Sequence, residues 1–155
     1  MSCQSEEEQY AYIPASVALQ TPLNFPNTTY NFDSNPLTEK GIELGKKLFY
    51  DGNLSADGIV SCGFCHVQSY GFTHHGHTVS HGVFDRIGTR NTPALQNLAF
   101  QNSFMWDGVS HNLDLNSIIP ITAEVEMDAN FNDINSYLQA KPSYVNLFKQ
   151  AFPKG

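Results

Sequence analysis

The sequence predicts a mainly α-helical protein with long loops and an extended N-terminal arm. Several segments place apolar residues at intervals of three and four, the spacing of a helix with one buried face. No segment alternates apolar and polar residues for long enough to predict a sheet. Residues 1–36 contain four prolines and many Asn, Thr and Ser residues without a helical period, which indicates a tail and an arm.

Length and charge limit the domain organisation and the partners. A chain of 155 residues, 41% of them hydrophobic, is long enough for one domain with one core. We expect residues 37–155 to form this domain, after the tail and arm of residues 1–36. The net charge of -7 argues against nucleic acid or anionic lipid as a partner and favours a basic protein. No stretch approaches the roughly 18 apolar residues that span a bilayer.

The first helix is expected to begin after Thr38, whose side chain suits an N-cap. Its buried face would consist of small and apolar residues at helical spacing, namely Gly41, Leu44, Gly45, Leu48 and Phe49. Asp51 and Gly52 end this helix, and residues 55–58 are expected to form a turn. A short helix follows within residues 60–67.

Residues 69–90 are expected to be irregular, because they contain four glycines and four histidines. A loop of this length inside a compact domain is usually functional or mobile. We therefore expect this segment to bind a ligand or to move.

Three further helical regions and one final helix are predicted downstream. Thr92 and Pro93 predict a helix to about Phe100, because proline is favoured at the first helical position. Residues 113–119 and 131–138 carry shorter helical patterns. Pro142 opens the last helix, which is expected to bury Val145, Leu147, Phe148 and Phe152.

Cys62, Cys65 and His66 form the most specific motif of the chain. Two cysteines three positions apart, followed directly by histidine, are typical of covalent haem attachment, in which the thiols add to vinyl groups and the imidazole binds iron. A zinc half-site would need a second pair of ligands, and a thioredoxin-like dithiol would need a βαβ pattern. We therefore expect one covalent haem c, with His66 as the proximal iron ligand.

The motif also indicates a compartment, because haem is attached to such motifs outside the cytoplasmic membrane. We expect an exported, periplasmic protein. Cys3, followed by a polar spacer, resembles the first residue of a mature bacterial lipoprotein and is a candidate for a lipid anchor. The alternative is an incidental terminal cysteine.

Several ordered motifs surround the haem cysteines. They are Leu44–Asp51, Leu54–Ser55, Val60–Ser61, Gly71–Thr73, Arg90–Pro93, Leu95–Asn97, Met105–Gly108 and Val125–Met127. Together they resemble the bacterial di-haem cytochrome c peroxidase family, which includes MauG-like proteins. The resemblance covers only the N-terminal haem domain of that family, because the chain has no second haem motif.

This resemblance implies a class I cytochrome c-like fold and a peroxidatic function. In the family, the N-terminal haem reduces hydrogen peroxide to water with electrons from a second haem domain. The implied partners are that domain, a small electron-donor cytochrome or cupredoxin, and a second copy in a full-length homodimer. Two alternatives remain open: a mono-haem electron-transfer cytochrome with Met105 or Met127 as second iron ligand, and a MauG-like oxidase of a protein substrate.

The resemblance also implies roles for two residues near the iron. His81 matches a distal histidine that caps the iron at rest and swings away on activation, with His74, His75 and His77 as competing candidates. Zinc or copper binding by these four histidines is an alternative. Glu126 matches the catalytic glutamate, which moves a proton between the peroxide oxygens, whereas a surface or capping carboxylate is the plainer interpretation.

Four other residues take their expected roles from the same resemblance. Asn116 stands where the family often has a glutamine that positions peroxide. Trp106 matches a residue between the two haems, although the sequence alone would assign it to the core. Arg90 is a candidate partner of a haem propionate, and Asn91 is a candidate ligand for calcium between the domains.

Overall fold

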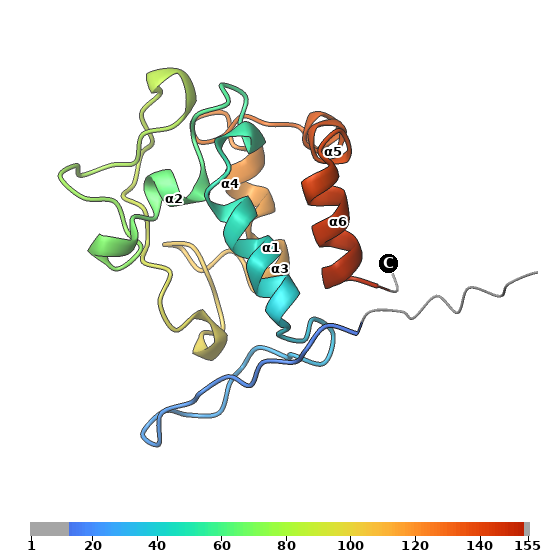
Figure 1. Cartoon of the computed structure of the whole chain (residues 1–155). Coiled ribbons are helices and arrows are strands. Elements are labelled where there is room, and N and C mark those ends of the chain that lie inside the picture. The colour runs from blue at the N-terminus through green and yellow to red at the C-terminus, as the bar shows by residue number, and fades with distance from the viewer. Residues whose placement is uncertain (1–12, 154–155) are drawn as a thin grey trace, which may run out of the picture.

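The computed structural model describes residues 13–153 and confirms a mainly helical fold (Figure 1). Its α-helices are α1 (Glu39–Phe49), α2 (Cys62–Cys65), α3 (Leu113–Asn116), α4 (Ile118–Thr122), α5 (Phe131–Gln139) and α6 (Pro142–Ala151). Within the described residues, only isolated β-bridges occur outside the helices and loops. No helix of this part is long and apolar enough to cross a membrane. Residues 1–12, including Cys3, lie outside the described residues.

Helix α1 begins as the sequence predicts. The Thr38 side chain accepts a hydrogen bond from the Gly41 amide at 3.0 Å and thereby satisfies a backbone donor of the first turn. Leu44 is buried where α1 packs against α6. Gly45, which was expected on the same buried face, is exposed.

Helices α5 and α6 close the fold beside α1 (Figure 1). Pro142 opens α6 as predicted, but the prediction that Phe152 is buried is wrong, since this residue follows the helix and is 51% exposed. Tyr144 is buried instead, because its hydroxyl donates to the Asp51 carboxylate at 2.6 Å. A tyrosine can enter a core when its polar end finds an acceptor.

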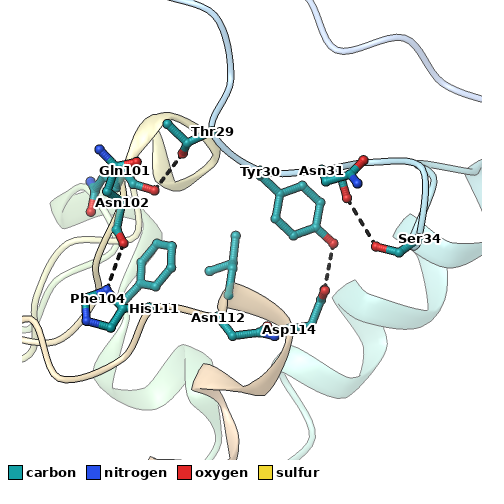
Figure 2. A pocket seen from close by; sticks show the side chains of 11 residues that line it. Thr29, Tyr30, Asn31, Ser34, Gln101, Asn102, Phe104, His111, Asn112 and Asp114 are labelled. Carbon is teal, nitrogen blue, oxygen red and sulfur yellow. Dashed lines mark hydrogen bonds between the residues drawn. The ribbon is translucent and has the colours of Figure 1, made fainter.

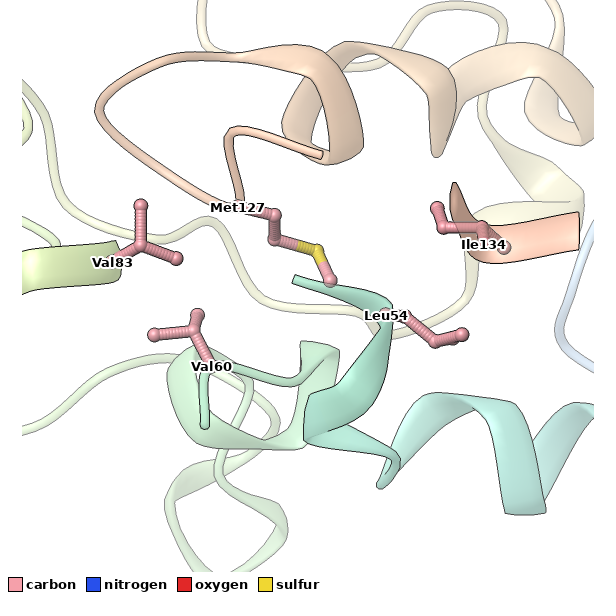
Figure 3. Close-up of a cluster of buried hydrophobic side chains, with 5 residues drawn as sticks. All are labelled: Leu54, Val60, Val83, Met127 and Ile134. Carbon is pink, nitrogen blue, oxygen red and sulfur yellow. The ribbon is translucent and has the colours of Figure 1, made fainter. Parts of the chain in front are cut away.

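A second cluster of buried side chains joins the helices to the loops (Figure 3). Its members are Leu54, Val60, Val83, Met127 and Ile134. Figure 3 shows Met127 reaching from its loop toward Leu54 and Ile134. Val83 is completely buried, so the loop that carries it is fixed to the core.

The predicted helix from Thr92 to Phe100 is wrong, because only a short 3-10 turn forms at Leu98–Phe100. The backbone groups before it bond elsewhere: the Leu95 amide donates to the Phe72 carbonyl at 3.3 Å. Asn97 then adopts a left-handed conformation with φ of 56°, which interrupts any helix. Pairing with a distant loop therefore overrides the local helix signal.

Residues 13–37 form the extended part of the arm. They contact the start of α1 and the loop around Ala99. Ser16 bridges Thr38 at the start of α1, and the Thr29 and Tyr30 amides donate to the Ala99 carbonyl. A polar pocket of about 260 Å³ lies between the arm and residues 101–114 (Figure 2). None of the predicted site residues lines this pocket.

Candidate functional site

The two haem-motif cysteines lie on α2, a single helical turn. The Ser61 side chain caps this turn by accepting from the Phe64 amide at 3.1 Å. Cys62 and Cys65 are three positions apart, so their side chains lie on one face of the turn, and neither forms a disulfide. Gly63 lies between them against Tyr50, and a Cβ there would lie 2.5 Å from the Tyr50 ring, so that ring would have to move.

The electrostatics of α2 argue against a catalytic dithiol. Burial raises the pKa of both thiols, and burial together with Glu126 and Cys62 raises the pKa of Cys65 to about 11. A reactive dithiol needs a lowered pKa.

Within residues 13–153, no three His, Cys, Asp or Glu side chains are arranged to hold a metal ion. This finding supports neither zinc binding by the cysteines nor zinc or copper binding by the histidines.

His66 is oriented by a backbone carbonyl. Its Nδ1 lies 2.9 Å from the Phe72 oxygen. A carbonyl only accepts, so Nδ1 carries the hydrogen and Nε2 keeps its lone pair for a metal. Burial lowers the pKa of His66, although the Phe72 and Pro93 carbonyls oppose that effect. The imidazole is therefore held neutral, as an iron ligand must be.

The carbonyl that orients His66 comes from a strained turn. Gly71 and Phe72 have φ of 70° and 60°, in the left-handed region. The Phe72 amide bonds back to the Val67 carbonyl at 3.0 Å. Phe49 packs beside both rings, with its centroid 6.4 Å from that of His66 and 6.3 Å from that of Phe72.

His81 lies next to the haem cysteines. The Cys65 thiol donates to the His81 carbonyl oxygen at 3.4 Å. His81 opens a hairpin, defined here as residues 81–87, in which it bridges Ile87. Gly82 must be glycine, because a Cβ there would lie 2.1 Å from the Val125 carbonyl oxygen.

The competing histidines surround His81. The His77 and His74 rings lie 4.6 and 6.0 Å from that of His81, while His75 stacks on Tyr70 at 3.8 Å. Burial and the neighbouring imidazoles lower the pKa of His74. Its Nδ1 is buried without a hydrogen-bond partner. The structure therefore brings all four predicted histidines together beside α2.

Glu126 lies in a turn, defined here as residues 123–128, that contacts the 81–87 hairpin. Its backbone carbonyl accepts from the Val83 amide at 2.8 Å. Burial raises the pKa of its carboxyl group. Because the Glu126 charge also raises the pKa of Cys65, the carboxylate lies within electrostatic reach of that thiol. Glu124, in contrast, is exposed.

Asn116 and Trp106 occupy different environments. The Asn116 side-chain oxygen is buried without a partner, which marks a polar atom that still needs a donor. Trp106 is 63% exposed, so the alternative that it belongs to the core is wrong. Its indole nitrogen donates to the Asn91 carbonyl at 2.6 Å.

Arg90 and Asn91 already have local partners. Arg90 pairs with Asp107 at 3.1 Å, and both side chains are more than half exposed. The Asn91 side-chain oxygen accepts from the Thr92 amide at 2.8 Å. The predicted propionate and calcium roles stay predictions.

Met127 and Met105 are the candidate iron ligands of the electron-carrier alternative. Met127 is 4% exposed and packs in the core cluster of Figure 3. Met105, the other candidate, has a left-handed backbone with φ of 69°. Neither observation tests the electron-carrier alternative, which stays a prediction.

Sequence reasoning missed two positioning groups. Arg86 bonds both the Glu124 carbonyl and the Asp128 carboxylate, each at 2.6 Å. Asp57 accepts from the amides of Val60 and Phe84 and so links the hairpin to the turn before α2. Asp57 lies in the turn that the sequence predicts at residues 55–58, although its bond to the distant Phe84 amide was not expected, whereas nothing local marks Arg86.

The residues around α2 fit a covalent haem. Two free thiols share a face, His66 offers a lone pair, and His74, whose ring lies 6.4 Å from that of Phe64 in α2, buries an unpaired ring nitrogen. Large apolar side chains remain more than half exposed on the loops, among them Ile87, Trp106 and Val109. A prosthetic group or a partner domain would cover such a surface.

Known proteins match most of this chain. A family model described as "Di-haem cytochrome c peroxidase" matches residues 39–155. The methylamine utilization protein MauG of Methylorubrum extorquens is 38% identical over 141 residues, covering 87% of this chain and 38% of that protein. Cytochrome c551 peroxidase of Pseudomonas aeruginosa is 36% identical over 138 residues, covering 88% of this chain and 39% of that protein.

A solved structure also matches most of this chain. It is described as a MauG-like protein associated with microbial copper homeostasis, and it matches with a TM-score of 0.81 at 29% identity. The match covers 90% of this chain and 41% of that chain. This chain thus spans about two fifths of the length of the curated relatives it matches.

Proposed function

The chain belongs to the di-haem cytochrome c peroxidase family, and from this premise we propose that it is the N-terminal, peroxidatic haem domain of such an enzyme. The proposed reaction reduces hydrogen peroxide to two molecules of water, with two electrons and two protons. Residues 37–155 form the proposed domain, and residues 1–36 form its tail and arm.

Three residues would hold the haem that the family carries. Cys62 and Cys65 supply the two thioether links, and His66 supplies the proximal nitrogen. When bound, the haem iron supplies the redox chemistry that peroxide reduction requires. The Phe72 carbonyl keeps the His66 ring in the orientation and tautomer that this ligation needs.

One observation carries the proposal most directly: the backbone of His81, the proposed distal ligand, contacts Cys65, and the charge of Glu126, the proposed proton carrier, acts on the same thiol. The Cys65 thiol contacts the His81 carbonyl, and its pKa responds to the Glu126 charge. Any group bound through Cys65 would therefore have His81 and Glu126 near it. An electron carrier needs no carboxylate in this position.

Glu126 would act as the acid–base group. Its carboxylate would take the proton from one peroxide oxygen and return it to the departing oxygen, so that no free hydroxide forms. Burial raises the pKa of Glu126 and so helps the carboxyl both to accept and to return a proton near neutral pH. The Asn116 side-chain oxygen, which is buried without a partner, would position peroxide by accepting a hydrogen bond from it.

Electrons and structural partners would come from outside this chain. A second haem domain would supply the electrons, which a small cytochrome or cupredoxin delivers, and Trp106 would lie along the path. Arg90 would exchange its exposed contact with Asp107 for a haem propionate. Asn91 would help to bind calcium only together with that second domain. We place the protein in the periplasm, with Cys3 as lipid anchor and a homodimer as the full-length assembly.

The second candidate is oxidation of a protein substrate, because proteins named MauG are among the relatives. The same peroxide-activating residues would serve both reactions. The difference would lie in the second haem domain, so the two candidates share every assignment made within this chain.

Substitution of Glu126 tests the proposal. Glu126→Gln keeps the size of the side chain but removes the proton carrier, so peroxide turnover by the haem-loaded protein with its second haem domain should fall by at least a hundredfold. The absorption spectrum of the haem should stay unchanged. Glu124→Gln, which alters the exposed neighbour, is the matched control. Unchanged turnover in Glu126→Gln would overturn the assignment.

A further inference from the structure

We propose that Arg86 is the residue that positions Glu126 relative to His81, an inference that rests on the proposed function. Arg86 belongs to the 81–87 hairpin, which begins with His81. Its guanidinium binds the 123–128 turn on both sides of Glu126. The proposed distal ligand and the proposed proton carrier would thus be held by one side chain.

The contacts of Arg86 bracket Glu126 in the sequence. Its Nη1 donates to the Glu124 carbonyl oxygen at 2.6 Å and to the Asp128 carboxylate at 2.6 Å. Hydrogen bonds from a charged donor to a carboxylate are stronger than neutral ones. Arg86 and Asp128 are about one third exposed, so the pair is only partly screened by water.

Backbone contacts tie the same two segments together at Glu126 itself. The Val83 amide donates to the Glu126 carbonyl at 2.8 Å, and Val83 is fully buried. Gly82 lies so close to Val125 that no side chain fits. A displacement of the hairpin is therefore passed on to the turn.

Both segments contain backbone that needs an external support. Phe84 and Asp85 have φ of 55° and 58°, and Asp128 has φ of 46°. Non-glycine residues adopt such angles only when surrounding contacts fix them. Arg86 closes the hairpin through its amide, which donates to Val83, and its side chain holds Asp128.

Arg86 would position the Glu126 carboxylate without contacting it, because its guanidinium bonds Glu124 and Asp128 on either side. Loss of these bonds would let the turn relax and move the carboxylate away from its place beside Cys65. Misplacement of a catalytic group by about an ångström lowers turnover strongly without preventing substrate binding. The signature of positioning is thus a fall in kcat with little change in KM.

The test compares three variants in the haem-loaded protein joined to its second haem domain. Arg86→Gln and Asp128→Asn should each lower kcat for peroxide by about tenfold, with KM within about twofold. Arg86→Lys, which keeps one donor and the charge, should recover part of the loss. Hydrogen exchange at the Val83 amide should speed up about tenfold in Arg86→Gln, a readout that is independent of activity.

Controls separate positioning from general stability and from the proposed function. Lys40→Gln removes a cation from the ion pair with Glu43 on α1 and should leave kcat and Val83 exchange unchanged. If Arg86→Gln lowers thermal stability but leaves kcat and Val83 exchange at wild-type values, the positioning role is wrong. If Glu126→Gln retains turnover, the proposed function itself fails, which is a distinct result.

Discussion

Two regions of the molecule are built on different principles. The helical half consists of α1, α5 and α6, and the loop half consists of residues 66–128. All six non-glycine residues of positive φ among the described residues lie between Phe72 and Asp128, in the loop half. The helical half satisfies its backbone locally, with caps from Thr38 and Asn130.

The difference shows where structure is determined by sequence neighbours and where it is determined by distant partners. In the loop half, the Val83 amide bonds to Glu126 and the Thr73 hydroxyl bonds to Thr92. Each left-handed non-glycine residue costs about 1 kcal/mol or more, which such contacts must offset. The predicted site residues outside α2 all lie in the loop half.

The largest effect expected is the loss of the haem itself. Cys65→Ser removes one thioether, so the covalent haem should be reduced to a singly attached or dissociable form. The loop half should then exchange its amide hydrogens much faster, while α1 and α6 retain their protection. Haem staining of the denatured protein and hydrogen exchange would measure these two changes.

Cys3→Ser is the matched control for the cysteine variant, and it should retain the covalent haem fully. Equal loss of protection in α1 and α6 would contradict the division into two halves. It would mean that the haem supports the whole fold rather than the loop half.

Two glycine substitutions, one in each half, should change the free energy of unfolding in opposite directions. Gly82→Ala places a methyl group against the Val125 carbonyl and should lower the free energy of unfolding by about 3 kcal/mol. Gly45→Ala, within α1, meets nothing within 4 Å and should raise it by about 1 kcal/mol, because alanine favours helix. Denaturant unfolding of the haem-loaded protein measures both values, and a stabilising Gly82→Ala would contradict the close packing of the hairpin.

A smaller effect is expected in the helical half from Asp51→Asn. The Asp51 carboxylate accepts from Tyr144 at 2.6 Å and from Tyr137 at 2.9 Å, so its neutralisation should cost about 2 kcal/mol of unfolding free energy. Burial acts to raise the pKa of Asp51, but hydrogen bonds from Tyr144, Asn53 and Tyr137 outweigh it and lower the pKa.

The lowered pKa gives this prediction a pH dependence. A carboxylate with a lowered folded pKa contributes stability above its unfolded pKa of about 4, and the contribution is lost as pH falls through the folded pKa. The difference between wild type and Asp51→Asn should therefore shrink in acid. Asp33→Asn, at an exposed site, should change neither the free energy of unfolding nor its dependence on pH. A difference in stability between wild type and Asp51→Asn that does not change with pH would contradict the role of Asp51.

The sequence predicts the helical half well, since Thr38, Pro142 and the apolar spacing act within a few residues of one another. It fails at Thr92–Phe100, where the Leu95 amide bonds to Phe72 more than twenty residues away. Spacing alone predicts Cys62, Cys65 and His66 as the haem-binding residues, because two attachments and one ligation would come from one turn. The contacts of Arg86 cannot be predicted in this way, because its partners, Glu124 and Asp128, are distant in the sequence.

The arm has a consequence for the order in which parts of the chain fold. Thr29 and Tyr30 bond to Ala99, Gln101 and Asp114 across separations of 70 to 84 residues. Contacts between such distant positions form late, because the intervening chain must first be ordered. That chain includes α2 with both haem cysteines, so we expect the arm to dock only after the segment around α2 has folded.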